Sequence, residues 1–81
     1  MSTFNSLPIF VALVEAGSFS KAGEQLDSSK SAVSKRISQL EDELGVRLFN
    51  RTTRSLTLTE AGEEYYEYAS QALSLAKEAE Y

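Results

Sequence analysis

The chain has 81 residues, which is enough for one small domain whose core is marginal and gains stability from a partner surface. It contains no cysteine and no histidine, so disulfides, thiolate metal sites and histidine-based metal binding or proton transfer are excluded. The net charge of −4 at pH 7 argues, taken alone, against a nucleic-acid partner, because phosphate neutralisation needs lysine and arginine.

Membrane and export signals are missing from the sequence. No apolar run approaches the roughly 18 residues of a membrane span, and the N-terminus lacks the basic start and apolar stretch of a signal peptide. We therefore expect a cytoplasmic protein with no membrane partner.

The first predicted helix covers about residues 6–16, where Pro8 suits a first turn and Gly17 stands where a helix would stop. Its apolar residues keep helical spacing and are interpreted as core: Leu7, Phe10, Val11, Leu13 and Val14. Phe19 is expected to join the same core.

A second, short helix is predicted to begin after Ser20 as its cap and to end near Leu26, with Gly23 permitting close approach of a neighbouring helix. A turn follows, in which Asp27 tolerates the left-handed conformation and Ser29 caps the next helix. Two helices joined by such a turn form a helix-turn-helix.

The next helix, over residues 29–45, is the most informative stretch of the chain. One apolar stripe is formed at spacings of four, three and four residues by Val33, Ile37, Leu40 and Leu44. The opposite face gathers small hydroxyls and lysines near the helix start: Ser31, Ser34, Lys35 and Ser38, with Lys30 at the edge. Farther along, an acidic surface is expected from Glu41, Asp42 and Glu43. An anionic partner would therefore approach the N-terminal half, whose small polar face suits a DNA major groove.

The charges are segregated along the chain, so the net charge alone does not exclude an anionic partner. Seven of the eight basic residues lie between Lys21 and Arg54, whereas six of the twelve acidic residues lie from Glu60 onward. No acidic residue occurs from Leu44 to Thr59. The middle of the chain is thus a candidate for phosphate contact.

Residues 46–59 predict a small β-hairpin around the polar turn of residues 52–55. Apolar residues on both sides anchor it to the core: Leu48, Phe49, Leu56 and Leu58. Its tip and flanks carry residues that would enter a minor groove or contact phosphates: Arg51, Thr52, Thr53 and Arg54. For Arg47, farther from the tip, a solvated side chain is the preferred interpretation.

The last predicted helix is capped by Thr59, has Glu60 in its first turn and runs nearly to the end of the chain. A heptad-like seam repeats at spacings of four, three, four and three: Tyr65, Ala69, Ala72, Ala76 and Ala79. Tyr66 and Leu73 lie beside it. A helix of about 20 residues extends roughly 30 Å, longer than so small a core covers, so we expect a second helix to pack on this seam. The alternative is that it packs only on its own domain.

Two long stretches carry a family resemblance. FVALVEAGSFSKAGEQL, followed by SAVSKRISQLEDELGVRLFNRTTRSLTLTEAG, resembles in order and spacing the N-terminal DNA-binding domain of the LysR-type transcriptional regulators. The resemblance covers essentially the whole chain. It implies a mainly α fold with a small β-hairpin, namely a winged helix-turn-helix over residues 1–58 and a linker helix over residues 59–81. It also implies that the helix from about Lys30 lies in the major groove, the hairpin at the adjacent minor groove, and the last helix antiparallel to that of its dimer mate.

By position, Lys30, Ser31, Ser34 and Lys35 match the family's groove-facing and phosphate-facing positions, and Arg54 matches its wing arginine. The predicted DNA-binding residues are Ser29, Lys30, Ser31, Ser34, Lys35, Ser38, Arg51, Thr52 and Arg54. The predicted dimerisation residues are Tyr65, Tyr66, Ala69, Ala72, Leu73 and Ala76. Departures from the family's usual residues occur at Gly23, Asp27, Ser28, Lys30 and Lys35, and the two lysines prevent transfer of an operator sequence, because lysine lacks arginine's planar fork.

The leading hypothesis is therefore sequence-specific binding of double-stranded DNA, at an inverted-repeat operator, by a homodimer without a cofactor. Family members carry a small-molecule sensing domain after the long helix. It is absent from this sequence, so we expect a piece of a longer regulator, although a naturally short protein remains an alternative.

A rival class is a helical dimerisation or adaptor module that binds protein, favoured by the acidic net charge. An enzyme has the least support, because Glu63, Glu64 and Glu67 at helical spacing form a solvated face.

Overall fold

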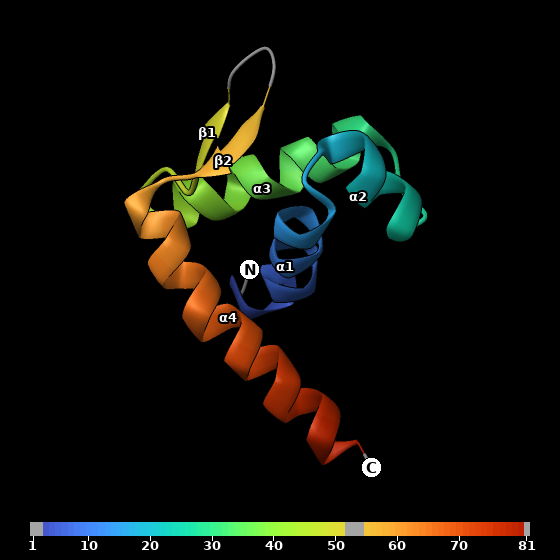
Figure 1. The fold of residues 1–81 in the computed structure, drawn as a ribbon, viewed down its shortest axis with the longest axis vertical. Coiled ribbons are helices and arrows are strands. Elements are labelled where there is room, and N and C mark those ends of the chain that lie inside the picture. Colours follow the sequence, from blue (N-terminus) through green and yellow to red (C-terminus); the bar gives the residue numbers. More distant parts are fainter. Residues whose placement is uncertain (1–2, 52–54, 81) are drawn as a thin grey trace.

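The computed structural model describes residues 3–51 and 55–80, and it is mostly helical with one two-stranded antiparallel hairpin (Figure 1). The elements in chain order are the 3-10 helix Thr3–Ser6, α1 (Leu7–Ala16), α2 (Phe19–Gln25), α3 (Lys30–Leu44), β1 (Phe49–Arg51), β2 (Leu56–Leu58) and α4 (Glu60–Ala79). The predicted fold class is confirmed, and the short 3-10 helix is an addition that the sequence did not predict. No helix among these described residues is long and apolar enough to cross a membrane.

The helix ends follow local rules, with one correction. Ser29 Oγ accepts the N–H of Ala32 at 3.0 Å, and Asp27 takes a left-handed φ of 54°, both as predicted. The start of α2 was predicted wrongly: the helix begins at Phe19, and its cap is Ser18, whose Oγ accepts the N–H of Lys21 at 3.1 Å. Ser18 has the extended backbone that a cap requires, whereas Ser20 lies inside the first turn.

The core is organised around Phe10 of α1, which is completely buried. Its ring centroid lies 5.5 Å from that of Phe49 on β1, 5.0 Å from that of Tyr65 and 6.4 Å from that of Tyr66, both on α4. α1 therefore sits centrally in Figure 1, with α3 above it, α2 at the upper right, the hairpin above α3 and α4 on the left. The other fully buried large side chains come from α1, α3 and the hairpin base: Leu13, Ile37, Leu40 and Leu48.

The helix-turn-helix formed by α2 and α3 is tight. A Cβ atom on Gly23 would lie 2.8 Å from the carbonyl oxygen of Ser28 and 3.3 Å from the amide nitrogen of Lys30. The prediction that Gly23 permits close approach is confirmed, because the turn and the first residue of α3 pack directly on its backbone.

Two expectations for the end of α3 were wrong. Leu44 was placed on the apolar stripe but is 36% exposed, since it is the last residue of the helix, and Gly45 then turns the chain away with a φ of 72°. Glu41 was placed on an acidic surface but is only 3% exposed. The buried side of α3 therefore ends with the carboxylate of Glu41 instead of Leu44. The hydrogen-bond partners of Glu41 are described below.

The hairpin, or wing, pairs Phe49 with Leu58 and Arg51 with Leu56. Leu48 and Phe49 are buried and Leu56 and Leu58 are partly buried against the core, as predicted. The predicted tip residues Thr52, Thr53 and Arg54 lie outside the described residues.

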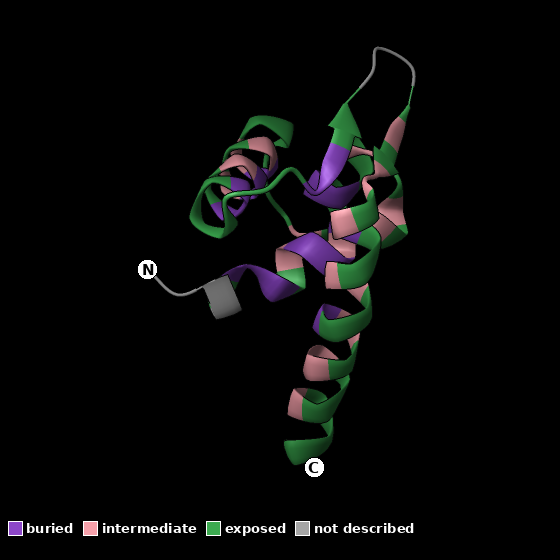
Figure 2. Ribbon diagram, turned by 90° about the vertical axis from the view of Figure 1, so that its left-hand side faces the viewer, coloured by how far each residue is buried: buried purple, intermediate pink, exposed green. Residues whose placement is uncertain are grey.

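α4 packs its first half on the domain and extends beyond it. Ala69 is 2% exposed, while the last turns are largely open to solvent (Figure 2). The molecule measures 40 × 27 × 22 Å, and its long axis has the wing at one end and the C-terminal end of α4 at the other (Figure 1).

Candidate nucleic-acid interface

The exposed face of α3 carries the hydroxyls and lysines that the sequence singled out. Lys30, Ser31 and Lys35 are exposed, and Ser34 and Ser38 are partly exposed beside them. Ser29 is exposed too, but its hydroxyl oxygen already accepts the N–H of Ala32 in the helix cap. Its hydroxyl hydrogen remains available to donate to a partner. The buried apolar residues of α3 point the other way into the core, so this face remains open to a partner; they are Val33, Ile37 and Leu40.

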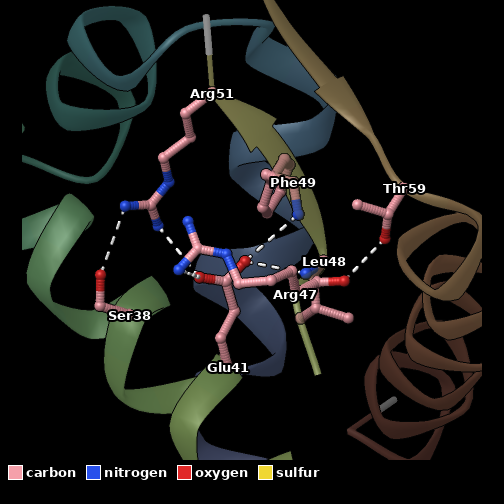
Figure 3. A network of polar contacts seen from close by, with 7 residues as sticks. All are labelled: Ser38, Glu41, Arg47, Leu48, Phe49, Arg51 and Thr59. Carbon is pink, nitrogen blue, oxygen red and sulfur yellow. Dashed lines mark hydrogen bonds and ion pairs between the residues drawn. The ribbon is translucent and has the colours of Figure 1, made fainter. Parts of the chain in front are cut away.

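Arg51 joins the wing to this face. Its Nη1 donates to Ser38 Oγ at 3.4 Å and its Nη2 to Glu41 Oε1 at 3.3 Å, both on α3 (Figure 3). The guanidinium carbon also lies 5.3 Å from the ring centroid of Phe19. The side chain stays 27% exposed, so part of the guanidinium remains accessible. The polar face of α3 and the first wing strand therefore form one continuous surface, which we call the basic face.

A surface hollow lies where α2, α3 and the wing meet. Its lining includes Ser20 of α2, Lys30 of α3 and Arg51 of β1. Two cations and a hydroxyl from three elements thus converge on one place. Sequence reasoning missed Ser20, since it was assigned to a cap, and no local pattern indicates its proximity to residues ten and thirty-one positions later.

Glu41 is the second residue that sequence reasoning missed. Its Oε2 accepts the backbone N–H groups of Leu48 at 2.8 Å and Phe49 at 3.2 Å, and its Oε1 accepts from Arg51 (Figure 3). Arg47 lies at the limit of ion-pair distance, 4.0 Å, with a side chain 67% exposed, which agrees with the solvated interpretation.

The predicted dimerisation residues lie mostly against their own domain. Ala69 is buried in the core, and four of the others are partly buried against it: Tyr65, Tyr66, Ala72 and Leu73. Tyr66 donates to Glu15 Oε2 at 3.2 Å across to α1. Burial raises the pKa of the Tyr65 phenol; desolvation and then the Glu15 carboxylate raise the pKa of Tyr66, so both rings stay neutral at neutral pH.

The free apolar side chains of α4 lie on an adjacent face. Tyr68 is 68% exposed and Leu75 is 66% exposed, seven residues apart. Near Tyr68, the exposed Leu44 and Val46 help to line a hollow with Ala61 at the start of α4. We call Leu44, Val46, Tyr68 and Leu75 the apolar face. Tyr68 and Leu75 were not among the predicted dimerisation residues, although their seven-residue spacing is visible in the sequence.

Fold and surface together define the class of protein: this is a winged helix-turn-helix domain with a long C-terminal helix. Residues 4–63 match the family model described as the bacterial regulatory helix-turn-helix protein, lysR family, and the chain belongs to that family.

Curated relatives and solved structures agree with this family assignment. The chain is 54% identical over 67 residues to the HTH-type transcriptional regulator CrgA of Neisseria meningitidis, covering 83% of this chain and 22% of that protein. It is 49% identical over 67 residues to the transcriptional activator AaeR of Escherichia coli, again covering 83% and 22%. The chain therefore spans about a fifth of the length of these relatives.

Several solved structures with a similar fold are complexes with DNA. The complex of the BenM DNA-binding domain with benA site 1 DNA superposes with a TM-score of 0.90 at 37% identity, covering 98% of this chain and 88% of that chain. The CbnR DNA-binding domain in its DNA complex gives a TM-score of 0.88 at 35% identity, with coverage of 98% and 90%. The chain thus has the fold of a LysR-type DNA-binding domain.

Proposed function

We propose that this chain binds double-stranded DNA sequence-specifically, with α3 in the major groove and the wing at the adjacent minor groove. The observation that carries the proposal is the 3.4 Å contact between Arg51 and Ser38, because it joins the wing to the exposed face of α3. A major groove admits one α-helix, and the short hydroxyls of this face let the backbone approach base edges closely.

Roles follow from position on the basic face. Ser31, Ser34 and Lys35 are proposed to reach base edges, and each good contact discriminates by about 1–3 kcal/mol. Ser29, Lys30 and Ser38 lie at the ends and edge of the same face and are assigned to phosphates or to the groove wall. Arg51 reaches a phosphate through its remaining N–H groups, and Ser20 contacts the same strand from α2. Thr52 and Arg54, outside the described residues, keep their sequence-based assignment to the minor groove or the phosphates beside it, and for Arg54 we propose a phosphate contact.

The DNA complexes of the two neighbours support this docking, since both proteins share the fold over nearly the whole chain. The charge distribution supports it too. The carboxylates of Glu63, Glu64 and Glu67 are exposed on α4, an element that contributes no residue to the basic face, so a chain of net charge −4 can still offer phosphate a cationic surface.

We further propose a homodimer through α4. The apolar face is the preferred contact, because Tyr68 and Leu75 remain exposed after the domain has packed. At about 100° per residue, the partly exposed Tyr65, Ala72 and Ala76 lie at its edge. Tyr66, Ala69 and Leu73, also predicted from the seam, would then support the interface from behind. A two-fold dimer presents two copies of α3, so its operator is an inverted repeat.

The two parts of the chain keep the roles expected from the sequence: residues 1–58 contact DNA and residues 59–81 pair the two copies. We place this activity in the cytoplasm, where a bacterial chromosome lies. Response to a small-molecule inducer would need a further domain of the kind found in the longer family members. Neither catalysis nor an adaptor role is proposed, since relatives of this family are named transcriptional regulators.

Selection of bound sequences from a random duplex pool tests the proposal. We expect enrichment of an inverted repeat, which would establish specificity and dimeric symmetry together. The matched control is the Lys35→Ala chain carried through the same selection, which should enrich a different or weaker motif. Failure of the unmodified chain to enrich any duplex would overturn the proposal and favour a protein-binding adaptor.

A further inference from the structure

Glu41 carries its carboxylate into the protein interior, where removing a charge from water costs free energy. Its side chain is 3% exposed, although its neighbours Asp42 and Glu43 on α3 are open to solvent. A carboxylate withdrawn from water is tolerated when hydrogen bonds replace its hydration, and here three donors do so: Leu48 N, Phe49 N and Arg51 Nη2. Among the described residues, no buried side-chain polar atom lacks a partner.

These donors all belong to the wing and its base. Leu48 precedes β1, Phe49 begins it and Arg51 ends it, so one carboxylate of α3 holds the strand at both ends (Figure 3). Arg51 additionally reaches Ser38, nearly one turn earlier on the same helix. Contacts to two successive turns of α3 restrict both the distance and the rotation of the strand relative to the helix.

The same segment holds the start of α4. Leu48 O accepts the N–H of Thr59 at 2.9 Å, and Arg47 O accepts the Thr59 hydroxyl at 2.7 Å. Thr59 Oγ1 in turn caps α4 by accepting the N–H of Gly62 at 2.9 Å. A continuous chain of hydrogen bonds therefore runs from Glu41 through residues 47–48 to the first turn of α4.

We propose that Glu41 is a positioning residue for DNA binding: its buried carboxylate fixes the wing, and through residues 47–48 the start of α4, relative to the recognition helix α3. The inference rests on the proposed DNA-binding function and adds a residue that touches no DNA itself. Two DNA-contacting elements bind one duplex well only if their spacing is preset, because otherwise binding must first order the wing. Loss of the carboxylate should weaken binding even where the fold survives.

The decisive variant is Glu41→Gln, which keeps the size of the side chain but removes the charge that pairs with Arg51. Its amide group also brings two donors to a place already lined by donors. Glu43→Gln is the matched control, since it removes the same charge from an exposed position on the same helix. Because the chain has no cysteine, spin labels attach only at Gln39→Cys on α3 and Thr57→Cys on β2. Mixing the labelled chain with an excess of unlabelled chain leaves at most one labelled copy in each dimer, so the labels report the helix-to-wing distance within one chain. Both positions are exposed and outside the network.

We expect a narrow distance distribution in the unmodified and Glu43→Gln chains and a broad one in Glu41→Gln, all without DNA. Affinity for the enriched duplex, measured where circular dichroism shows each chain folded, should fall about tenfold in Glu41→Gln only. If Glu41→Gln does not fold, Arg51→Lys replaces it. The shorter lysine side chain ends in one nitrogen, so it does not reproduce the two contacts that Nη1 and Nη2 make with Ser38 and Glu41, and the same broadening is then expected.

A distribution as narrow in these variants as in the unmodified chain would overturn the proposal, and so would a broad distribution with unchanged affinity. Equal effects of Glu41→Gln and Glu43→Gln would show a general charge effect and overturn it as well. If the unmodified chain bound no duplex, the proposed function itself would fail, while the distances would still show whether Glu41 holds the wing.

Discussion

Arg51 Nη1 lies 3.4 Å from Ser38 Oγ, which joins residues thirteen positions apart on two different elements. The contact matters because Ser38 ends the hydroxyl face of α3 and Arg51 is the last residue of the first wing strand. A helix that contacts base edges in a groove and a hairpin that contacts the DNA backbone next to it must be held side by side. The contact between Arg51 and Ser38 holds α3 and the wing in this way.

The polar face of α3 should determine which sequence is preferred. We expect Lys35→Ala and Ser34→Ala each to lose about 1–3 kcal/mol on the preferred duplex and to change the ranking of duplexes mutated at single base pairs. Competition titrations by fluorescence anisotropy at moderate salt measure this. Gln39→Ala, exposed on the same helix but not among the predicted contacts, serves as control. Unchanged rankings for both variants would remove these residues from the site.

Arg54 should contribute affinity without specificity. Arg54→Ala is expected to weaken binding to all duplexes by a similar factor and to reduce the slope of log K against log salt by about one, since one phosphate contact is lost. Arg47→Ala removes the same charge from a side chain that is 67% exposed, and we expect a smaller effect. Equal slopes for the unmodified and Arg54→Ala chains would contradict the wing assignment.

The apolar face of α4 should control dimer formation. Leu75→Glu places a charge on the exposed apolar side chain and is expected to raise the dimer dissociation constant at least about a hundredfold, because a buried unpaired charge costs several kcal/mol. Sedimentation equilibrium measures it. Ser74→Glu adds the same charge one residue away, at an exposed position on a different face. A dimer disrupted equally by both, or by neither, would argue against this register.

Gly62 should be required for the packing of α4 on the hairpin base. A Cβ atom there would overlap the carbonyl oxygen of Leu48, which is backbone and cannot turn away. We therefore expect Gly62→Ala to lower the free energy of unfolding by about 1–3 kcal/mol, despite alanine's better helix propensity. Urea denaturation gives the value, with Ser74→Ala as the helix control. A stabilised Gly62→Ala chain would mean that this packing is looser than described.

Most of the fold was predictable because local rules decide it. Helical spacing identified the buried side chains of α1 and α3, and the side chains of Ser29 and Thr59 form the cap hydrogen bonds that their positions predicted. The face of α3 was predictable for the same reason: once Val33 and Ile37 are inside, Ser34 and Lys35 must lie elsewhere.

The misses share a cause, which is that their partners are distant in sequence. Glu41 was assigned to solvent by its charge, although it follows Ile37 by four residues and so lies beside the apolar stripe. Its burial depends on backbone N–H groups seven and eight residues later, which no side-chain pattern reveals. The packing of α4 also depends on a distant partner: Ala69, a member of the predicted seam, is buried in its own domain, where α4 lies against α1.

The central claim is that α3 and the wing form one DNA-binding surface, and a titration of the isotope-labelled chain with the enriched duplex tests it most directly. The account predicts that amide resonances shift together over residues 29–38 and 50–56, with little change over residues 70–80 when the dimer is already formed. Shifts confined to α4, or shifts on α3 with none on the wing, would contradict it.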